Sequence, residues 1–175
     1  MTHPEAASRT IRSTAGIVWL VVTGGVVLFL LVDVVVRGSA TQALLIAPWL
    51  LLVVWFAWVF LASPRVTSDA HGVVVRNPLR TTAATWGAVV DITLRWQVTL
   101  ELAEGRPVQA WALAARRQGR RPVEQPAERE LELLRELRSA ASPAPGTIRR
   151  TWDVPAIVAL VVLLVWAGIA VALTR

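Results

Sequence analysis

The chain has 175 residues, of which 55% are hydrophobic, and it carries a formal net charge of +6 at pH 7. It contains no Cys, which excludes disulfides, thiolate nucleophiles and Cys-ligated metals among these residues. So high a fraction of hydrophobic residues, combined with a net positive charge, is unusual for a soluble domain and typical of a small membrane protein with basic polar segments.

Three long apolar runs, at residues 15–36, 43–62 and 154–173, dominate the sequence. A helix rises about 1.5 Å per residue, so roughly 20 apolar residues cross a hydrocarbon core about 30 Å thick. The predicted architecture is therefore three membrane-spanning α-helices, with residues 15–62 forming a hairpin. Small residues at Gly38 and Ala40 would suit a signal-peptide cleavage site, but the first run exceeds the 7–15 residues of a signal core.

The cationic side chains are all Arg, and their distribution predicts the orientation. Two lie before the first run, one lies between the first two runs, and fourteen lie between residues 63 and 153. Because positively charged loops stay in the cytoplasm, we expect the N-terminal tail, residues 1–14, and the polar block to be cytoplasmic. The C-terminus would then be extracytoplasmic, and the location would be the plasma (inner) membrane.

Asp33 is the one ionisable residue well inside a predicted span. Such a group can serve a proton or ion relay, but Arg37 follows four residues later, a spacing that brings two side chains together on one helix face. The pattern favours a structural ion pair. Small residues in the first and third runs would allow close contact between helices, namely Gly24 and Gly25, and Gly168 with Ala172. Assembly into a homo-oligomer is therefore an open alternative.

The polar block begins with a β pattern. Between residues 65 and 113 the sequence alternates apolar and polar residues or forms short β-branched runs, which indicates strands with one buried face. Gly, Pro, Asn and Asp lie between these stretches, and they indicate the turns at which the chain reverses. The reversal needed at residues 95–97 has neither Gly nor Pro, so one long bent strand is the alternative there. We expect core packing for the Trp residues within the strand patterns, Trp86, Trp96 and Trp111.

A basic linker, residues 116–126, separates the β pattern from an amphipathic helix predicted at residues 127–141. The helix places Leu133, Leu134 and Leu137 on one face. A single helix of about 15 residues is marginal in water, so this stripe should lie on the β-domain, on a partner or on the bilayer. Residues 142–153 are expected to be a juxtamembrane linker.

Several stretches together resemble the bacterial PH-like domain of small actinobacterial membrane proteins. They are Gly72 to Thr81 (GVVVRNPLRT), Val89 to Ile92 (VVDI) and Leu100 to Leu113 (LELAEGRPVQAWAL). The resemblance implies a cytosolic α+β module at residues 63–115, a bent antiparallel β-barrel or sandwich with one helix. Eukaryotic PH domains bind phosphoinositides through the first hairpin loop. The corresponding hairpin here, which would join residues 73–76 to residues 81–86, offers only Arg76 and Arg80. The resemblance implies a scaffold or interaction module.

The sequence offers little catalytic chemistry. His71 lies in a turn beside Asp69, with Ser68 nearby, but contiguous turn residues do not converge on one reacting atom as the members of a triad do. Neither a glycine-rich phosphate loop nor a two-His metal spacing occurs. We expect no enzyme activity, no catalytic residue, no cofactor and no metal. Nucleic acid is not an expected partner, because ten acidic residues intersperse the fourteen Arg of the polar block.

Three functions remain open. The leading hypothesis is an interaction or scaffold module whose sheet and stripe of Leu133, Leu134 and Leu137 dock a membrane or cell-envelope protein. The first alternative is an inner-leaflet module that binds anionic lipid head groups, at about 1 kcal/mol per basic residue near the surface. A further alternative is a small transporter or enzyme subunit that acts only in an oligomer. The arginines proposed for head-group contact, which would otherwise only set orientation, are Arg116, Arg117, Arg120 and Arg121.

Overall fold

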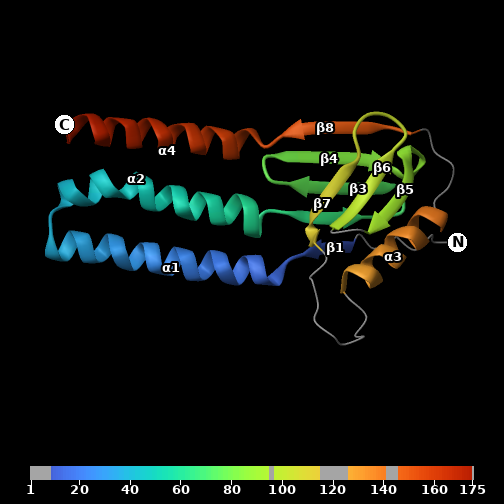
Figure 1. The fold of residues 1–175 in the computed structure, drawn as a ribbon, viewed down its shortest axis with the longest axis horizontal. Coiled ribbons are helices and arrows are strands. Elements are labelled where there is room, and N and C mark those ends of the chain that lie inside the picture. The colour runs from blue at the N-terminus through green and yellow to red at the C-terminus, as the bar shows by residue number, and fades with distance from the viewer. Residues whose placement is uncertain (1–8, 95–96, 115–125, 141–145, 175) are drawn as a thin grey trace, which may run out of the picture. The chain divides into compact units, whose positions relative to one another are not determined.

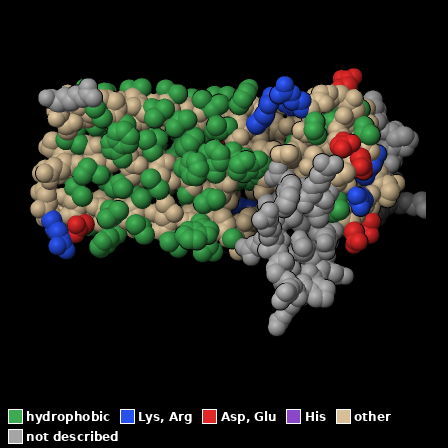
Figure 2. Space-filling view, in the orientation of Figure 1, with side chains coloured by type: hydrophobic (Ala, Val, Ile, Leu, Met, Phe, Trp, Pro, Cys, Tyr) green, Lys and Arg blue, Asp and Glu red, His purple; other side chains and the backbone are tan. Residues whose placement is uncertain are grey.

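The computed structural model describes residues 9–94, 97–114, 126–140 and 146–174. The chain divides into two compact units (Figure 1). The helical unit comprises Ser13–Ser63 and Asp153–Arg175, and the β unit comprises Met1–Arg12 and Pro64–Trp152. On the face shown in Figure 2, hydrophobic side chains cover the helices, whereas acidic and basic side chains are concentrated on the β unit.

The helical unit contains three helices that are long and apolar enough to cross a membrane, as the sequence predicted. They are α1 (Thr14–Arg37), α2 (Ala40–Ala57), which continues as the π-helical turn η1 (Trp58–Ala62), and α4 (Val154–Leu173). Each of α1, α2 and α4 begins at a polar cap, because a side-chain oxygen there accepts a bond from a backbone N–H left unpaired in the first turn. The caps are Ser13, Ser39 and Asp153.

Helix α2 packs against both α1 and α4. The Trp55 indole N–H donates a 2.9 Å hydrogen bond to the Ala156 carbonyl oxygen, which ties α2 to the first turn of α4. Gly16 is required where α1 meets η1, since a Cβ there would overlap the Leu61 carbonyl oxygen. The predicted ion pair is confirmed: Arg37 Nε lies 2.6 Å from Asp33 Oδ1, one turn apart on α1.

The β unit contains a five-stranded antiparallel sheet with the order β1-β2-β3-β4-β8. Alternation sets its inner face: Val73 and Val75 on β3 are buried, whereas Val74 between them is exposed. The strands β3 and β4 form the predicted hairpin, with Asn77 paired to Arg80. The bounds are β1 Arg9–Arg12, β2 Arg65–Ser68, β3 Gly72–Asn77, β4 Arg80–Thr85 and β8 Ile148–Trp152.

A second antiparallel sheet has the order β5-β6-β7 and follows a short 3₁₀ turn, η2 (Trp86–Ala88). Strands β5 (Val89–Leu94) and β6 (Gln97–Leu102) pair antiparallel, so the chain does reverse between them and the single bent strand is excluded. Strand β7 (Val108–Ala114) completes the sheet. The two sheets share one apolar core, with Val66 and Val75 from the first beside Ile92 and Leu100 from the second.

Helix α3 (Pro126–Ala140) packs on the β unit against β5. Leu134 is fully buried in the shared core and Leu137 packs against it. Arg135 donates from Nε and Nη2 to the carbonyl oxygen of Ile92, at 3.2 and 2.8 Å. This bond occupies a backbone group on β5, an edge strand, and so helps protect that edge from other chains. Leu134 and Leu137 therefore contribute to the domain's own core, and Leu134 is not available to a partner.

Two strands lie where the sequence predicted none. Strand β1 falls in the expected N-terminal tail and β8 in the expected juxtamembrane linker. Both are short edge strands, and the strands that pair with them in the described ranges, β2 and β4, are remote in the sequence. Among the Trp residues, Trp86 is buried as predicted, but Trp111 is half exposed, so its predicted core packing is wrong. Trp96 lies outside the described residues.

Candidate functional site

The core-facing side of the five-stranded sheet changes from apolar to polar along its length. In the β3–β4 hairpin, Val73 faces Ala84, Val75 faces Thr82, and Asn77 faces Arg80. Because side chains alternate along a strand, all of these residues point to the same face of the sheet. Asn77 and Arg80 therefore stand at one end of the inter-sheet core, on the side where a buried strand would carry apolar residues.

Strand β8 extends this polar end. Its Arg150 lies opposite Thr82, and its Trp152 lies opposite Arg80. The guanidinium carbon of Arg80 is 4.9 Å from the centroid of the Trp152 ring, within the range of a cation–π contact. This stacking restricts the Arg80 side chain, while the indole of Trp152 remains 60% exposed.

The loop between β6 and β7 contributes a third arginine, Arg106. Arg150 Nη2 donates a 2.7 Å hydrogen bond to the Arg106 carbonyl oxygen, which ties this loop to β8. Gly105 has a φ of 85°, a left-handed conformation that glycine adopts without a steric penalty. A Cβ at Gly105 would also lie 3.1 Å from Arg150 Nη2, so glycine leaves room for the guanidinium.

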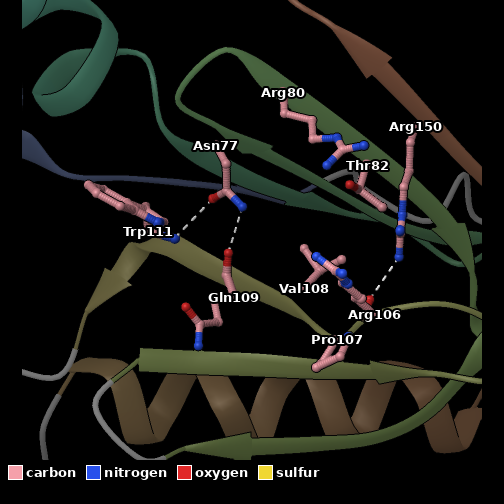
Figure 3. Close-up of a pocket in the computed structure, with 9 residues that line it drawn as sticks. All are labelled: Asn77, Arg80, Thr82, Arg106, Pro107, Val108, Gln109, Trp111 and Arg150. Carbon is pink, nitrogen blue, oxygen red and sulfur yellow. Dashed lines mark hydrogen bonds between the residues drawn. The ribbon is translucent and has the colours of Figure 1, made fainter.

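Asn77 joins the two sheets beside these arginines (Figure 3). Its Nδ2 donates to the Gln109 carbonyl oxygen at 2.6 Å, and its Oδ1 accepts from the Trp111 backbone N–H at 3.1 Å. The neighbouring turn holds Leu79 at a φ of 60°, the one positive φ of a non-glycine residue in the described ranges. Strain of this kind often accompanies functional sites.

These residues line a cavity of about 260 Å³, shown in Figure 3. Three guanidinium groups border it, and among the described residues no carboxylate does. Within the described part of the chain, none of the three arginines forms an ion pair. The arrangement can therefore hold an anion through charge-assisted hydrogen bonds, which are the stronger kind. The lining consists of Asn77, Arg80, Thr82, Arg106, Pro107, Val108, Gln109, Trp111 and Arg150.

The structure brings together few of the residues that the sequence singled out. Arg80 lines the cavity, and Arg76 lies opposite Thr81 in the same hairpin. Leu133 is half-buried on α3, beside the buried Leu134. The four arginines proposed for head-group contact, Arg116, Arg117, Arg120 and Arg121, lie outside the described residues.

The turn at residues 69–72 has a structural role. Asp69 Oδ1 accepts bonds from the backbone N–H groups of His71 and Gly72, and the Asp69 carbonyl oxygen accepts from the Trp86 indole N–H. His71 Nδ1 is 3.8 Å from Asp69 Oδ1, and its side chain is almost fully exposed. Across the described ranges, no three His, Cys, Asp or Glu side chains are grouped as a metal site requires.

Sequence reasoning missed the cavity because its arginines come from three separate segments. Arg106 stood out only within the stretch that resembles the PH-like domain, and Arg149, Arg150 and Trp152 fit an interfacial anchor before the last apolar run. Residues 148–152 show no alternation of apolar and polar side chains, so the sequence carries no local signal for this strand. The position of Arg150 at the cavity follows only from the pairing of β8 with β4.

Comparison with known families agrees with this architecture. Residues 63–129 match the family model described as a bacterial PH domain. The match runs from the start of the β-domain into α3 and leaves out β1 and β8. No curated protein and no solved structure matches the chain.

Proposed function

We propose that this chain, a bacterial PH domain-containing protein, is a membrane-anchored binding module that acts by docking an anionic partner and not by catalysis. A PH-like domain by itself suggests an interaction module. The observation that carries the finer proposal is the cavity bordered by Arg80, Arg106 and Arg150, whose described lining residues include no carboxylate. Like charges held close together repel one another, and an anionic group in the cavity relieves that repulsion.

The connections of the chain support a tethered module. Strand β1 precedes α1, β2 follows η1, and β8 precedes α4, in each case with only one or two residues between. Three candidate spans are therefore attached to strands of one sheet, two of them to its edge strands β1 and β8. A domain attached in this way stays at the bilayer surface, where its partner must also be found.

The distribution of arginines supports a cytoplasmic domain. Fourteen lie between residues 63 and 153, whereas the segment between the first two candidate spans has one. In keeping with the positive-inside rule, we propose that the β-domain lies at the inner leaflet of the cytoplasmic membrane. The partner we propose is therefore a membrane or cell-envelope component with an acidic group that reaches the cavity.

The test is site-specific photo-crosslinking of the full-length protein in its own membrane. A photoreactive amino acid replaces Gln109, which lines the cavity, or Val90, an exposed residue of β5 outside it. The proposal predicts discrete crosslinked species, to protein or lipid, from position 109 and not from position 90. Equal crosslinking from both positions, or none from 109, would remove its support.

A further inference from the structure

We propose that the cavity bordered by Arg80, Arg106 and Arg150 is a binding site for the phosphate of an anionic lipid head group. This inference rests on the proposed binding function and names the ligand. The site is distinct from the basic segment at residues 116–121, because it is built from β4, β8 and the loop between β6 and β7.

The size of the cavity suits a head group. Its volume is about 260 Å³, whereas a water molecule takes about 30 Å³ of liquid and drug-sized ligands occupy pockets of roughly 300–1,000 Å³. The cavity thus has room for one phosphate group and part of the polar group attached to it. The half-exposed Trp111 at its border leaves an apolar surface beside the charged groups.

The chemistry of the lining fits phosphate. Guanidinium groups present planar pairs of N–H donors that match two phosphate oxygens at once. Two of the three arginines are already restrained: Arg150 by its bond to the Arg106 carbonyl oxygen, and Arg80 by stacking on Trp152. Restrained side chains lose less entropy when they bind, so this geometry is partly prepared for an anion.

Two observations favour a lipid over an acidic protein. Trp152 and Trp111, which are 60% and 50% exposed, stand beside the arginines, and tryptophan is enriched at the level of lipid head groups. In addition, Arg150 precedes Val154, the first residue of α4, by four residues. Four extended residues reach at most about 14 Å, so the covalent chain alone keeps Arg150 near the bilayer surface.

The test uses the full-length protein, freed of lipid in a neutral detergent and titrated with short-chain phosphatidylglycerol, with native mass spectrometry as the readout. We expect saturable binding of phosphatidylglycerol and weaker binding of phosphatidylcholine. Each basic residue near the surface contributes about 1 kcal/mol, so Arg80→Gln and Arg150→Gln should each weaken binding by about fivefold. Arg80→Gln is the independent second variant, because Arg150 also holds the Arg106 loop.

Arg149→Gln is the matched control. Arg149 neighbours Arg150 in β8 but, by strand alternation, lies on the opposite face of the sheet. This substitution removes the same charge only one residue farther from α4, so a general surface-charge effect would weaken binding similarly in both variants. The proposal predicts that Arg149→Gln changes the affinity by less than about twofold.

Parallel titrations with inorganic phosphate and with an acidic peptide distinguish the sources of the anion. If inorganic phosphate binds as tightly as phosphatidylglycerol, or if the peptide binds more tightly, the lipid proposal is overturned. Equal losses in Arg149→Gln and Arg150→Gln would overturn it as well. Crosslinks from position 109 to a protein would still support the binding module in those cases, whereas their absence would remove that proposal separately.

Discussion

At the candidate site, one side chain, Asn77, links the two sheets through hydrogen bonds. It occupies the last position of β3, accepts from a β7 amide and donates to a β7 carbonyl. An Ala or Ser at this position would leave both backbone groups of β7 without this partner. The residue therefore links the geometry of the arginine-lined cavity to the packing of the domain.

The Asn77→Ala variant should lose both bonds, each worth about 1 kcal/mol in net terms. We expect faster hydrogen exchange at the Trp111 amide and a lower midpoint of thermal unfolding for the full-length protein in detergent. Asn77→Asp keeps the oxygen that accepts from Trp111, so it should retain protection of that amide. Identical exchange at Trp111 in the wild type and in Asn77→Ala would contradict the bridging role.

At the scale of single elements, the sequence predicted what depends on local pattern. The apolar runs located the ends of α1 and α4 to within one residue, because hydropathy over about 20 residues needs no knowledge of partners. Strands β3 to β7 were foreseen from alternation and turns. Strands β1 and β8 were not, since four or five residues with one inward apolar side chain become strands only when a remote edge is present.

Helix α3 shows a second limit of local pattern. Its leucine stripe predicted an amphipathic helix but not the surface that it covers. The structure settles this, because Leu134 is fully buried among core residues of both sheets. The arginine-lined cavity lay beyond prediction for a similar reason: three segments supply its charges, and only strand register brings them together.

We expect Leu134→Ala to destabilise the β-domain by about 2–5 kcal/mol, the usual range for deleting a buried leucine side chain. Leu133→Ala, at a half-buried position on the same helix, is the control and should cost less. Limited proteolysis and thermal unfolding of the full-length protein would measure the difference. Equal effects of the two substitutions, or a wild-type midpoint for Leu134→Ala, would contradict the packing of α3 on the sheets.

At the scale of the whole molecule, the β-domain is formed by segments that come before and after the first two candidate spans in the sequence. Strand β1 precedes α1, and its partner β2 follows η1, so segments on both sides of α1 and α2 pair in one sheet. A domain with this connectivity cannot be separated from α1 and α2 without losing strand β1. For the proposed function, the spans must insert into the membrane and the arginine-rich domain must remain on the cytoplasmic side.

The most direct test of this account is the side of the membrane on which the β-domain lies. Because the chain contains no Cys, single-cysteine variants can be labelled without background, using a maleimide that does not cross membranes. Ala40→Cys, at the first residue of α2 and next to the turn that joins the first two candidate spans, should be labelled in intact bacterial cells. Glu101→Cys, at an exposed position of β6, should be labelled only after the cells are permeabilised. Labelling of Glu101→Cys in intact cells would contradict the account.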